Sequence, residues 1–479
     1  MMPPSLASAL TLSLAAIAAI ACATFLPRSP DDRAASATQD PKPGDPVRLL
    51  ISGSMLGRLE PCGCASGQLG GLARRMQHIG ENRAYDVLIE GGDLVDSATE
   101  LDLMKWFTAI QILFGERPYD ALGVGSKDLA LPLDQWCGVL ATAPVVASDL
   151  TSTRPDWPCK PFVEKQVRGH TVRVASLTLQ LPPSPASADS EVKLLPAADG
   201  WKRGLEGAGD ETLRVLLLHT DETTVRKLVP QFQPAPDLVV CFDRGFVEPS
   251  GAAQSIGGVP LVFAGIRGRV LLEVALERLA DGRRATCSLV PLAGSKTLPG
   301  GGGDPTVKAV LLAHRDEVKE QGVLAKVARQ KPTPNGAAYV GSRICQGCHP
   351  SAWSAYEKMR HFHAWETLEK AEKDPKRYGW PVTAYPDCVS CHVVGFEEKT
   401  GFVTYEETPD LSAVGCERCH GPGSDHIQAP ATKKLGIHGG VMPSELCVQC
   451  HDFEQSPDFL YGNKWPLIQH GREPSQARK

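Results

Sequence analysis

From Val47 onward, short apolar runs alternate with amphipathic stretches. The runs have the length and the Val, Leu and Ile content of buried strands, and the amphipathic stretches repeat their apolar positions at helical spacing. This alternation predicts a largely parallel α/β core over residues 47–293, closed by antiparallel strands in 260–279 and 286–292. The predicted core strands are 47–53, 85–93, 119–126, 212–220 and 236–243, and the predicted helices are 70–82, 100–117 and 221–232.

The pattern changes after this core. Residues 294–305, "GSKTLPGGGGDP", form a glycine-rich break, and 306–330 have the pattern of one charged amphipathic helix, so 294–336 are predicted to be a linker with a connecting helix. The part from Ala337 to Lys479 holds 9 of the 13 histidines and 15 of the 29 aromatic residues. Such a composition is expected where flat cofactors, rather than aliphatic side chains, fill the interior of a domain.

The N-terminus is a long uncharged apolar stretch. Residues 1–26 predict an export signal or a membrane anchor, and 27–46 predict a flexible tether. The sequence Ala19-Ile20-Ala21-Cys22 is similar to a lipoprotein box, which makes Cys22 a candidate for lipidation. We therefore expect a periplasmic or other extracytoplasmic protein, with the N-terminal segment or a lipidated Cys22 as alternative contacts with the membrane.

Charge and cysteine content limit the partners and the compartment. The net charge is -5 and no long run of Lys or Arg occurs, so we expect no nucleic acid partner. Fifteen cysteines favour an exported protein over a reducing cytosol. Six of them lie in the predicted α/β core, where a disulfide such as Cys137–Cys159 is one option. Cys62 and Cys64 have two alternatives, disulfides or a redox or metal site.

The eight cysteines near the C-terminus all belong to Cys-x-x-Cys-His motifs. Zinc tolerates varied ligand spacing and gives no reason for a histidine directly after each second cysteine. Covalent haem c gives that reason, because two thioethers fix the porphyrin and the next residue brings its imidazole beneath the iron. We therefore predict four covalently bound haem c groups. The motifs are Cys345, Cys348 and His349; Cys388, Cys391 and His392; Cys416, Cys419 and His420; and Cys447, Cys450 and His451, each with its histidine as proximal ligand.

Five further histidines of this part are candidates for the sixth position of an iron. His363, His426 and His470 are the preferred distal ligands. His361 and His363 point about 200° apart on a helix, so only one of the two is expected to face inward. His361 and His438 remain open alternatives.

The C-terminal part resembles the tetrahaem cytochrome c-554 family. The resemblance lies in "YVGSRICQGCHPSAW", "HAWETL", "CHVVGF" and "VGCERCHGPGSDH". It implies a compact, mostly helical domain over 337–479 with three bis-histidine haems, one five-coordinate haem, and electron transfer to partner proteins. By this resemblance His363 and His426 fall on distal ligand positions, and His470 matches less firmly.

The front part resembles the metallophosphoesterase domain of secreted 5'-nucleotidases. The resemblance lies in "RLLISGSMLGRLEPCGCASGQLGGLARR", "VLIEGGDLVDS", "YDALGVGSKDLALP", "VLLLHTDE" and "LVVCFDRG". It implies an α/β sandwich that holds two metal ions at the strand ends. Only Asp93 and His219 match the family's ligands, and two ligands cannot hold two hard cations. We therefore expect no metal and no hydrolysis there. The ligand positions that differ are Ser54-Met55-Leu56, Ser126-Lys127-Asp128 and Cys241-Phe242-Asp243-Arg244.

These observations predict an exported multihaem c-type cytochrome for electron transfer, an electron carrier with no catalytic residues. Redox proteins are its expected partners, and the inactive phosphoesterase-like domain is expected to serve recognition of a partner or ligand. The first alternative is a haem oxidoreductase acting on a small nitrogen or sulfur compound. The second alternative is a metal-dependent nucleotidase or phosphoesterase fused to a cytochrome.

Overall fold

The chain divides into two units, Met1–Lys42 and Pro43–Lys479, and the described residues lie in the second. The predictions for the N-terminal segment and Cys22 therefore fall outside the described residues. Those for Cys62, Cys64 and His438 also fall outside them, in gaps of the second unit. In the part of the chain that is described, no helix is both long and apolar enough to cross a bilayer. The computed structural model describes residues 44–61, 67–82, 84–115, 117–182, 191–242, 251–279, 282–294, 302–374, 380–433, 435 and 442–470.

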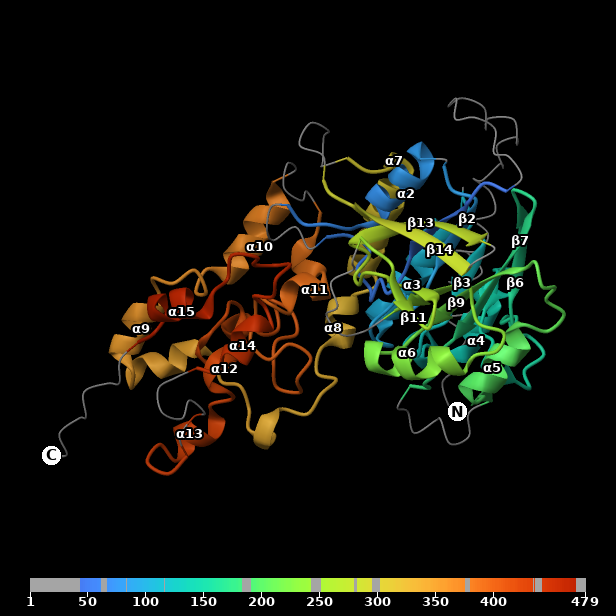
Figure 1. Cartoon of the computed structure of the whole chain (residues 1–479). Helices are drawn as coiled ribbons and strands as arrows, with labels where there is room; N and C mark the ends of the chain where they lie inside the picture. The colour runs from blue at the N-terminus through green and yellow to red at the C-terminus, as the bar shows by residue number, and fades with distance from the viewer. Residues whose placement is uncertain are drawn as a thin grey trace. The chain divides into compact units, whose positions relative to one another are not determined.

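Two six-stranded sheets form the centre of the α/β part (Figure 1). In the first sheet, four strands run parallel and two antiparallel strands close one edge. The register places Leu50 beside Leu88 in the parallel part and beside Glu273 in the antiparallel part. The strand order is β14 (Gly282–Pro291), β13 (Val270–Leu279), β1 (Val47–Ser52), β2 (Val87–Glu90), β3 (Ala121–Gly123) and β4 (Val145–Val146).

The second sheet also has a parallel centre with antiparallel edges. Its order is β11 (Gln254–Ile256), β12 (Val259–Phe263), β10 (Leu238–Cys241), β9 (Leu213–Leu218), β7 (His170–Leu177) and β6 (Val163–Val167). The strand β12 pairs in parallel with β10 but antiparallel with β11, and β13 pairs antiparallel with β14, so the predicted antiparallel strands are confirmed except for the pairing of β12 with β10. The two short strands β5 (Leu150–Ser152) and β8 (Val192–Leu194) pair separately.

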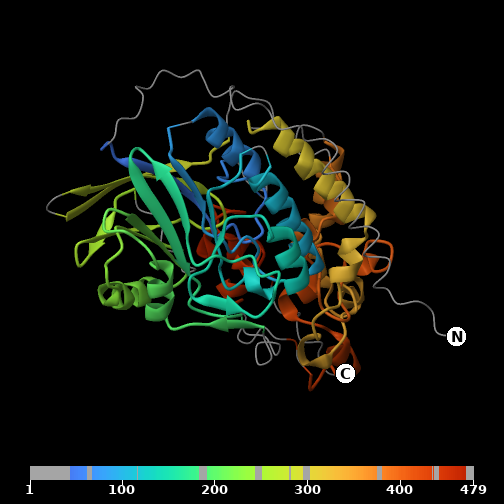
Figure 2. The same cartoon turned by 90° about the vertical axis from the view of Figure 1, so that its right-hand side faces the viewer.

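Apolar side chains fill three layers of this part. The inner faces of the two sheets pack against each other through residues such as Ile51, Ile89 and Val240. A second layer lies between the first sheet and helices, and a third lies between the second sheet and helices (Figure 2). The helices on the first sheet are α2 (Leu72–Glu81), α3 (Glu100–Leu113), α4 (Leu133–Leu140) and α7 (Pro305–Glu320), and those on the second are α5 (Ala197–Gly204) and α6 (Glu222–Leu228).

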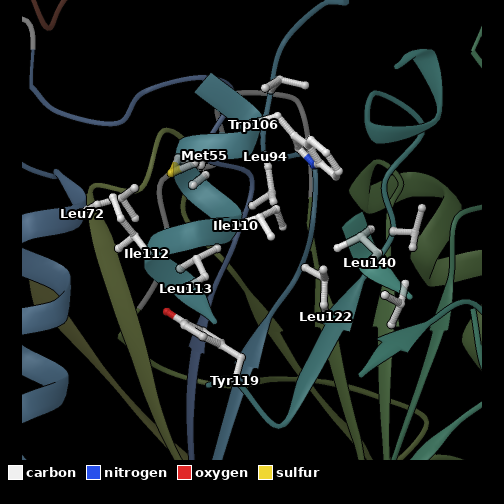
Figure 3. Close-up of a cluster of buried hydrophobic side chains, with 14 of the residues drawn as sticks. Met55, Leu72, Leu94, Trp106, Ile110, Ile112, Leu113, Tyr119, Leu122 and Leu140 are labelled. Carbon is white, nitrogen blue, oxygen red and sulfur yellow. The ribbon is translucent and has the colours of Figure 1, made fainter. Parts of the chain in front are cut away.

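The helix α3 shows how sequence fixes one of these layers. Thr99 begins it by accepting a hydrogen bond from the Asp102 backbone N–H at 3.2 Å, while the Asp102 carboxylate accepts one from the Thr99 N–H. Its apolar side chains then enter the layer over the first sheet. Figure 3 draws Ile110 and Leu113 of α3 in this layer, together with Leu122 of β3.

The predicted connecting helix corresponds to α7 and α8, and α7 packs into the same layer through Val307 and Leu311. Its predicted length is wrong. Gly322 adopts a left-handed conformation (φ 63°) that ends the helical course, and α8 (Val323–Val327) begins after it.

The C-terminal part consists of short helices, and within its described residues strand-like pairing is limited to isolated bridges, such as Val393 with Ser412. One small apolar cluster includes Trp365, Val389 and Phe402. The predicted fold class, an α/β sandwich followed by a mostly helical domain, is confirmed. The helices are α9 (Pro350–Tyr356), α10 (Ala364–Lys373), α11 (Pro386–Val389), α12 (Cys416–His420), α13 (Ser424–Gln428), α14 (Ser444–Val448) and α15 (Tyr461–Lys464), with the 3-10 turn η7 (Ser342–Gly347) before α9.

Candidate haem-binding sites

Each Cys-x-x-Cys-His motif lies on a tight helical turn. In the first motif, the His349 N–H donates to the Cys345 carbonyl at 2.9 Å, and in the fourth the His451 N–H donates to the Cys447 carbonyl at 2.9 Å. Such a turn presents both cysteines and the histidine on one face of the chain. None of the eight motif cysteines, all of them among the described residues, forms a disulfide, so each sulfur can form a thioether bond.

Three imidazole pairs join a motif histidine to a histidine from a different segment. The ring centres of His349 and His426 are 6.1 Å apart, those of His361 and His451 are 6.0 Å apart, and those of His420 and His470 are 5.7 Å apart.

These separations fit two imidazoles on opposite sides of one metal ion. With a metal–nitrogen bond of about 2.0–2.1 Å and about 1 Å from each nitrogen to its ring centre, trans imidazoles have ring centres about 6 Å apart. The residues present therefore fit a metal ion between each pair.

Hydrogen bonds to the other ring nitrogen orient several of these imidazoles. The Nδ1 atom of His392 lies 2.6 Å from the Ala364 carbonyl, and Nδ1 of His426 lies 2.7 Å from the Lys433 carbonyl. A carbonyl oxygen can only accept, so Nδ1 is the protonated nitrogen and Nε2 keeps its lone pair. Nδ1 of His451 lies 2.8 Å from Ser456 Oγ. Ligating histidines usually have such a partner on the second nitrogen.

The structure places His361, and not the preferred candidate His363, opposite a motif histidine. His361 lies opposite His451, whereas the Nδ1 atom of His363 lies 3.1 Å from the Glu366 carboxylate, with about half of its side chain exposed. His363 is thus placed away from the three pairs. His361 lies inside a compact turn, and its own backbone carbonyl accepts a hydrogen bond from the Val414 N–H at 3.1 Å. This bond holds the turn that carries His361.

Apolar side chains around the motifs are left exposed. Of the ten large hydrophobic side chains that are exposed among the described residues, eight lie in the C-terminal part. Apolar side chains scattered singly are normal on a protein surface, but these are concentrated in the part of the chain that carries the four motifs. The arrangement fits flat apolar cofactors that cover these side chains. The eight are Ile344, Tyr405, Ile427, Leu446, Val448, Phe453, Leu460 and Leu467.

The motifs also approach one another. The Cys345 and Cys416 side chains lie near enough to shift each other's pKa, and the Cys391 side chain lies near enough to lower the pKa of Cys450. The first and third motifs are thus neighbours, as are the second and fourth. Arg418, inside the third motif, donates to Cys450 Sγ at 3.6 Å and connects the two groups.

A buried carboxylate holds the first and third motifs together. Glu417, also inside the third motif, is 2% exposed and accepts from the N–H groups of Val340 (3.0 Å), Gly341 (2.8 Å) and Gly423 (2.7 Å). These groups belong to the chain segments that lead to His349 and His426. Glu417 therefore fixes the segments that carry both members of one imidazole pair.

The strand ends of the α/β part hold a second polar cluster. Asp93 Oδ2 lies 3.9 Å from Nδ1 of His219, and both side chains are fully buried. Asp128 accepts from the N–H groups of Asp93 (2.6 Å) and Leu94 (2.9 Å). Burial, with the Asp93 charge beside it, raises the pKa of Asp128, while Lys127 pairs with Asp96.

An aromatic ring closes these strand ends. The Phe242 ring is fully buried and stacks on His219, with ring centres 5.0 Å apart. A Cβ at Gly53 or Gly91 would lie 2.6 or 2.1 Å from this ring, so the phenyl group rests directly on the ends of β1 and β2. In the described residues, His, Cys, Asp and Glu form no group of three or more that could hold a metal ion.

The disulfide between Cys137 and Cys159, one option for these cysteines, is not formed. Both thiols are free and buried. Burial is also the main cause that raises the pKa of each.

Known proteins resemble the C-terminal part of the chain. Residues 344–421 match the family model "Cytochrome c554 and c-prime". The chain is also 36% identical over 146 residues to "Cytochrome c-554" of Nitrosomonas europaea. This match covers 25% of the chain and 61% of the relative, so the chain spans less than two thirds of that protein's length. The predicted resemblance to cytochrome c-554 is confirmed, and it implies covalently bound haem c.

Solved structures extend the comparison to both parts. The calcineurin-like phosphoesterase YfkN of Bacillus subtilis is 18% identical (TM-score 0.43) and covers 57% of this chain and 97% of its own. A 5'-nucleotidase precursor of Thermus thermophilus is also 18% identical (TM-score 0.44), over 65% of this chain and 68% of its own. Reduced cytochrome c554 of Nitrosomonas europaea is 26% identical (TM-score 0.22), over 28% of this chain and 84% of its own.

Some features of the site had no signal in the sequence. A glutamate between two motif cysteines is an ordinary residue in one dimension, and only the fold shows that Glu417 binds three backbone N–H groups. Phe242 was noted only as a departure from a ligand pattern. Its stacking on His219 depends on the glycines that directly follow two other strands.

Proposed function

We propose that this protein is a multihaem electron-transfer protein with four haem c groups in its C-terminal part. In this proposal the eight motif cysteines form the thioether bonds, and His349, His392, His420 and His451 are the proximal ligands. His426, His361 and His470 serve as distal ligands opposite His349, His451 and His420. The observation that carries the proposal is the set of three cross-segment imidazole pairs at 5.7–6.1 Å.

Haem c, when bound, supplies reversible one-electron chemistry. The chain's own residues orient and insulate it. The Ala364 and Lys433 carbonyls hold His392 and His426 with Nε2 free for a metal. Glu417 fixes the segments of the first pair, and the contacts between motifs keep successive sites close.

The proposed setting follows from the sequence. Export to an extracytoplasmic compartment, through the apolar segment 1–26, agrees with haem attachment by cysteine. Redox proteins donate and accept the electrons. The α/β part serves to recognise a partner or to place the haem chain. It does not act as a hydrolase, because Phe242 covers the strand ends where metal ligands would be needed.

Paired ligand variants test this function. The full chain, produced with haem attachment, should contain four haems per chain by a pyridine haemochrome assay. His426→Ala should convert one haem from low spin to high spin in the EPR spectrum. His363→Ala is the matched control on an exposed histidine and should leave the spectrum unchanged. A preparation without covalent haem, or equal spectra for the parent and His426→Ala, would contradict the proposal.

The same samples test the two alternatives. A haem oxidoreductase predicts turnover of nitrite, hydroxylamine or a small sulfur compound by the purified protein. A hydrolase predicts release of phosphate from nucleotides with manganese or zinc added. We expect neither activity.

A further inference from the structure

A cavity of about 640 Å³ lies where the α/β part meets the C-terminal part. The C-terminal part lines it with Cys391, His451 and Phe459, and the α/β part lines it with Arg58 and Arg267. Its size falls in the range of roughly 300–1,000 Å³ that is usual for ligand and cofactor cavities. Because Cys391 belongs to the second motif and His451 to the fourth, the α/β part forms a wall shared with two haem sites.

The α/β fold holds Arg267 firmly at this wall. Its backbone N–H donates to the Ser54 carbonyl at 2.7 Å, which ties the loop between β12 and β13 to the end of β1. Arg267 has φ of 58°, and a Cβ at the next residue, Gly268, would lie 2.8 Å from Nη2 of the buried Arg75. The hydrogen bond to Ser54 fixes Arg267 relative to β1, and its guanidinium group projects from there toward the C-terminal part.

The Arg267 side chain reaches the residues directly after His451. Its Nη1 atom lies 3.1 Å from Asp452 Oδ2 and 2.8 Å from Glu454 Oε2. The guanidinium also lies over the Phe453 ring, 5.6 Å from its centre. The α/β part thus places a permanent positive charge beside the fourth motif, between two carboxylates of the C-terminal part.

A second contact fixes the segment before the second motif. Lys105 of α3 pairs with Asp387 at 2.7 Å, and the Lys105 side chain is only 6% exposed. Asp387 directly precedes Cys388. Nearby, the Arg315 guanidinium of α7 lies 4.1 Å from the centre of the Trp380 ring. The second and fourth motifs are therefore both held against the α/β part.

We propose that the α/β part completes the haem cavity shared by the second and fourth motifs, and that Arg58 and Arg267 raise the reduction potential of the haem held there. The inference rests on the proposed function. The ferric form carries one more positive charge than the ferrous form, so a fixed positive charge nearby favours reduction, and more strongly where water is excluded. This role requires no hydrolytic chemistry from the α/β part.

The test uses the full haem-loaded chain. Arg267→Gln removes the charge and leaves Asp452 and Glu454 without it. In an optical redox titration, we expect one or two of the four haem potentials to fall and the others to stay unchanged. Arg58→Gln should act in the same direction, and Arg267→Lys should give a smaller shift because it keeps the charge. Arg284→Gln is the matched control, since Arg284 is 61% exposed and pairs with Glu277 on the β13–β14 hairpin.

Titration curves of Arg267→Gln and Arg58→Gln that superimpose on the parent curve would overturn the inference. If Arg267→Gln does not accumulate, the Arg58→Gln curve decides alone. The pyridine haemochrome assay on the same samples distinguishes a failure of the proposed function from a failure of this inference. Fewer than four haems in the parent chain would refute the proposed function, whereas four haems with unchanged potentials would refute only the role of the arginines.

Discussion

The two parts of the molecule build their interiors differently. The α/β part fills three layers with its own aliphatic and aromatic side chains. The C-terminal part has one small cluster and carries eight of the ten exposed large hydrophobic side chains among the described residues. The contrast indicates that the first interior is complete in the polypeptide, whereas the second needs bound groups to cover its apolar surface.

Polar groups show the same contrast. In the α/β part, buried charges meet directly, as Arg75 and Glu90 do at 2.7 Å. In the C-terminal part, imidazoles face each other with ring centres about 6 Å apart, as in the pair of His349 and His426 at 6.1 Å. The two charges of a direct ion pair compensate each other within the polypeptide, whereas a separated imidazole pair gains its full value only with a metal ion between the rings.

The largest expected effect of a single substitution is in the α/β part. Arg75→Met should lower its free energy of unfolding by about 3–5 kcal/mol, because the Glu90 carboxylate is left buried without its partner. Urea unfolding followed by tryptophan fluorescence measures this. Arg284→Met is the control on an exposed ion pair and should cost less than about 1 kcal/mol. Equal losses in the two variants would show that the buried pair is not needed for this interior.

A smaller effect is expected in the C-terminal part. Glu417→Ala leaves buried backbone N–H groups without an acceptor, at a cost of about 1–3 kcal/mol. It should also loosen His426 and add a high-spin EPR signal. Glu398→Ala is the control, since the Glu398 carboxylate accepts from the side-chain hydroxyl of Tyr339 at 2.6 Å and not from the backbone N–H groups that Glu417 binds. An unchanged spin state in Glu417→Ala would contradict a role of Glu417 in positioning the ligand His426.

The smallest effect concerns the junction between the two parts. His314 of α7 lies 2.9 Å from Thr108 Oγ1 and 3.2 Å from the Tyr385 hydroxyl. Burial, with the charges of Lys105 and Arg315 nearby, lowers the pKa of His314 to about 4. The unfolded chain binds this proton near pH 6.5, so it carries more protons than the folded protein between these values. Stability should therefore be lost as the pH falls from about 6.5 to about 4.

Between pH 7 and pH 5 the expected loss from His314 is about 1–2 kcal/mol. The variant His314→Gln has no titrating group and should show a flatter dependence. Urea unfolding of both proteins at the two pH values measures the difference. The same pH dependence in the parent and the variant would contradict a neutral His314 at the junction.

The sequence predicted the α/β part well where pattern and fold are local. All five predicted core strands form, because runs such as 212–220 are too apolar to lie outside a sheet. Between residues 127 and 211 no element was predicted. Strands as short as β4, with two residues, have no detectable period, but the eight-residue strand β7 was missed although its length was sufficient. The parallel pairing of β12 with β10 was also missed, because pairing direction depends on the crossover connection and not on the strand itself.

The candidate site was predictable in its covalent part and not in its geometry. The motif spacing identifies Cys416, Cys419 and His420 without a structure. The partner of His451 depends on which side of a turn faces inward, and His361 and His363 differ by only two positions. Contacts between distant segments decide that choice, and no local pattern records them.

Hydrogen exchange of the chain with and without attached haem tests the central claim most directly. The haem-free chain is produced without the attachment machinery, and exchange is followed by mass spectrometry over both parts. We predict that protection over residues 47–293 persists without haem, while protection over 337–470 is lost. Equal protection of residues 337–470 in the two preparations would contradict the account, because the C-terminal part would then have a complete interior of its own.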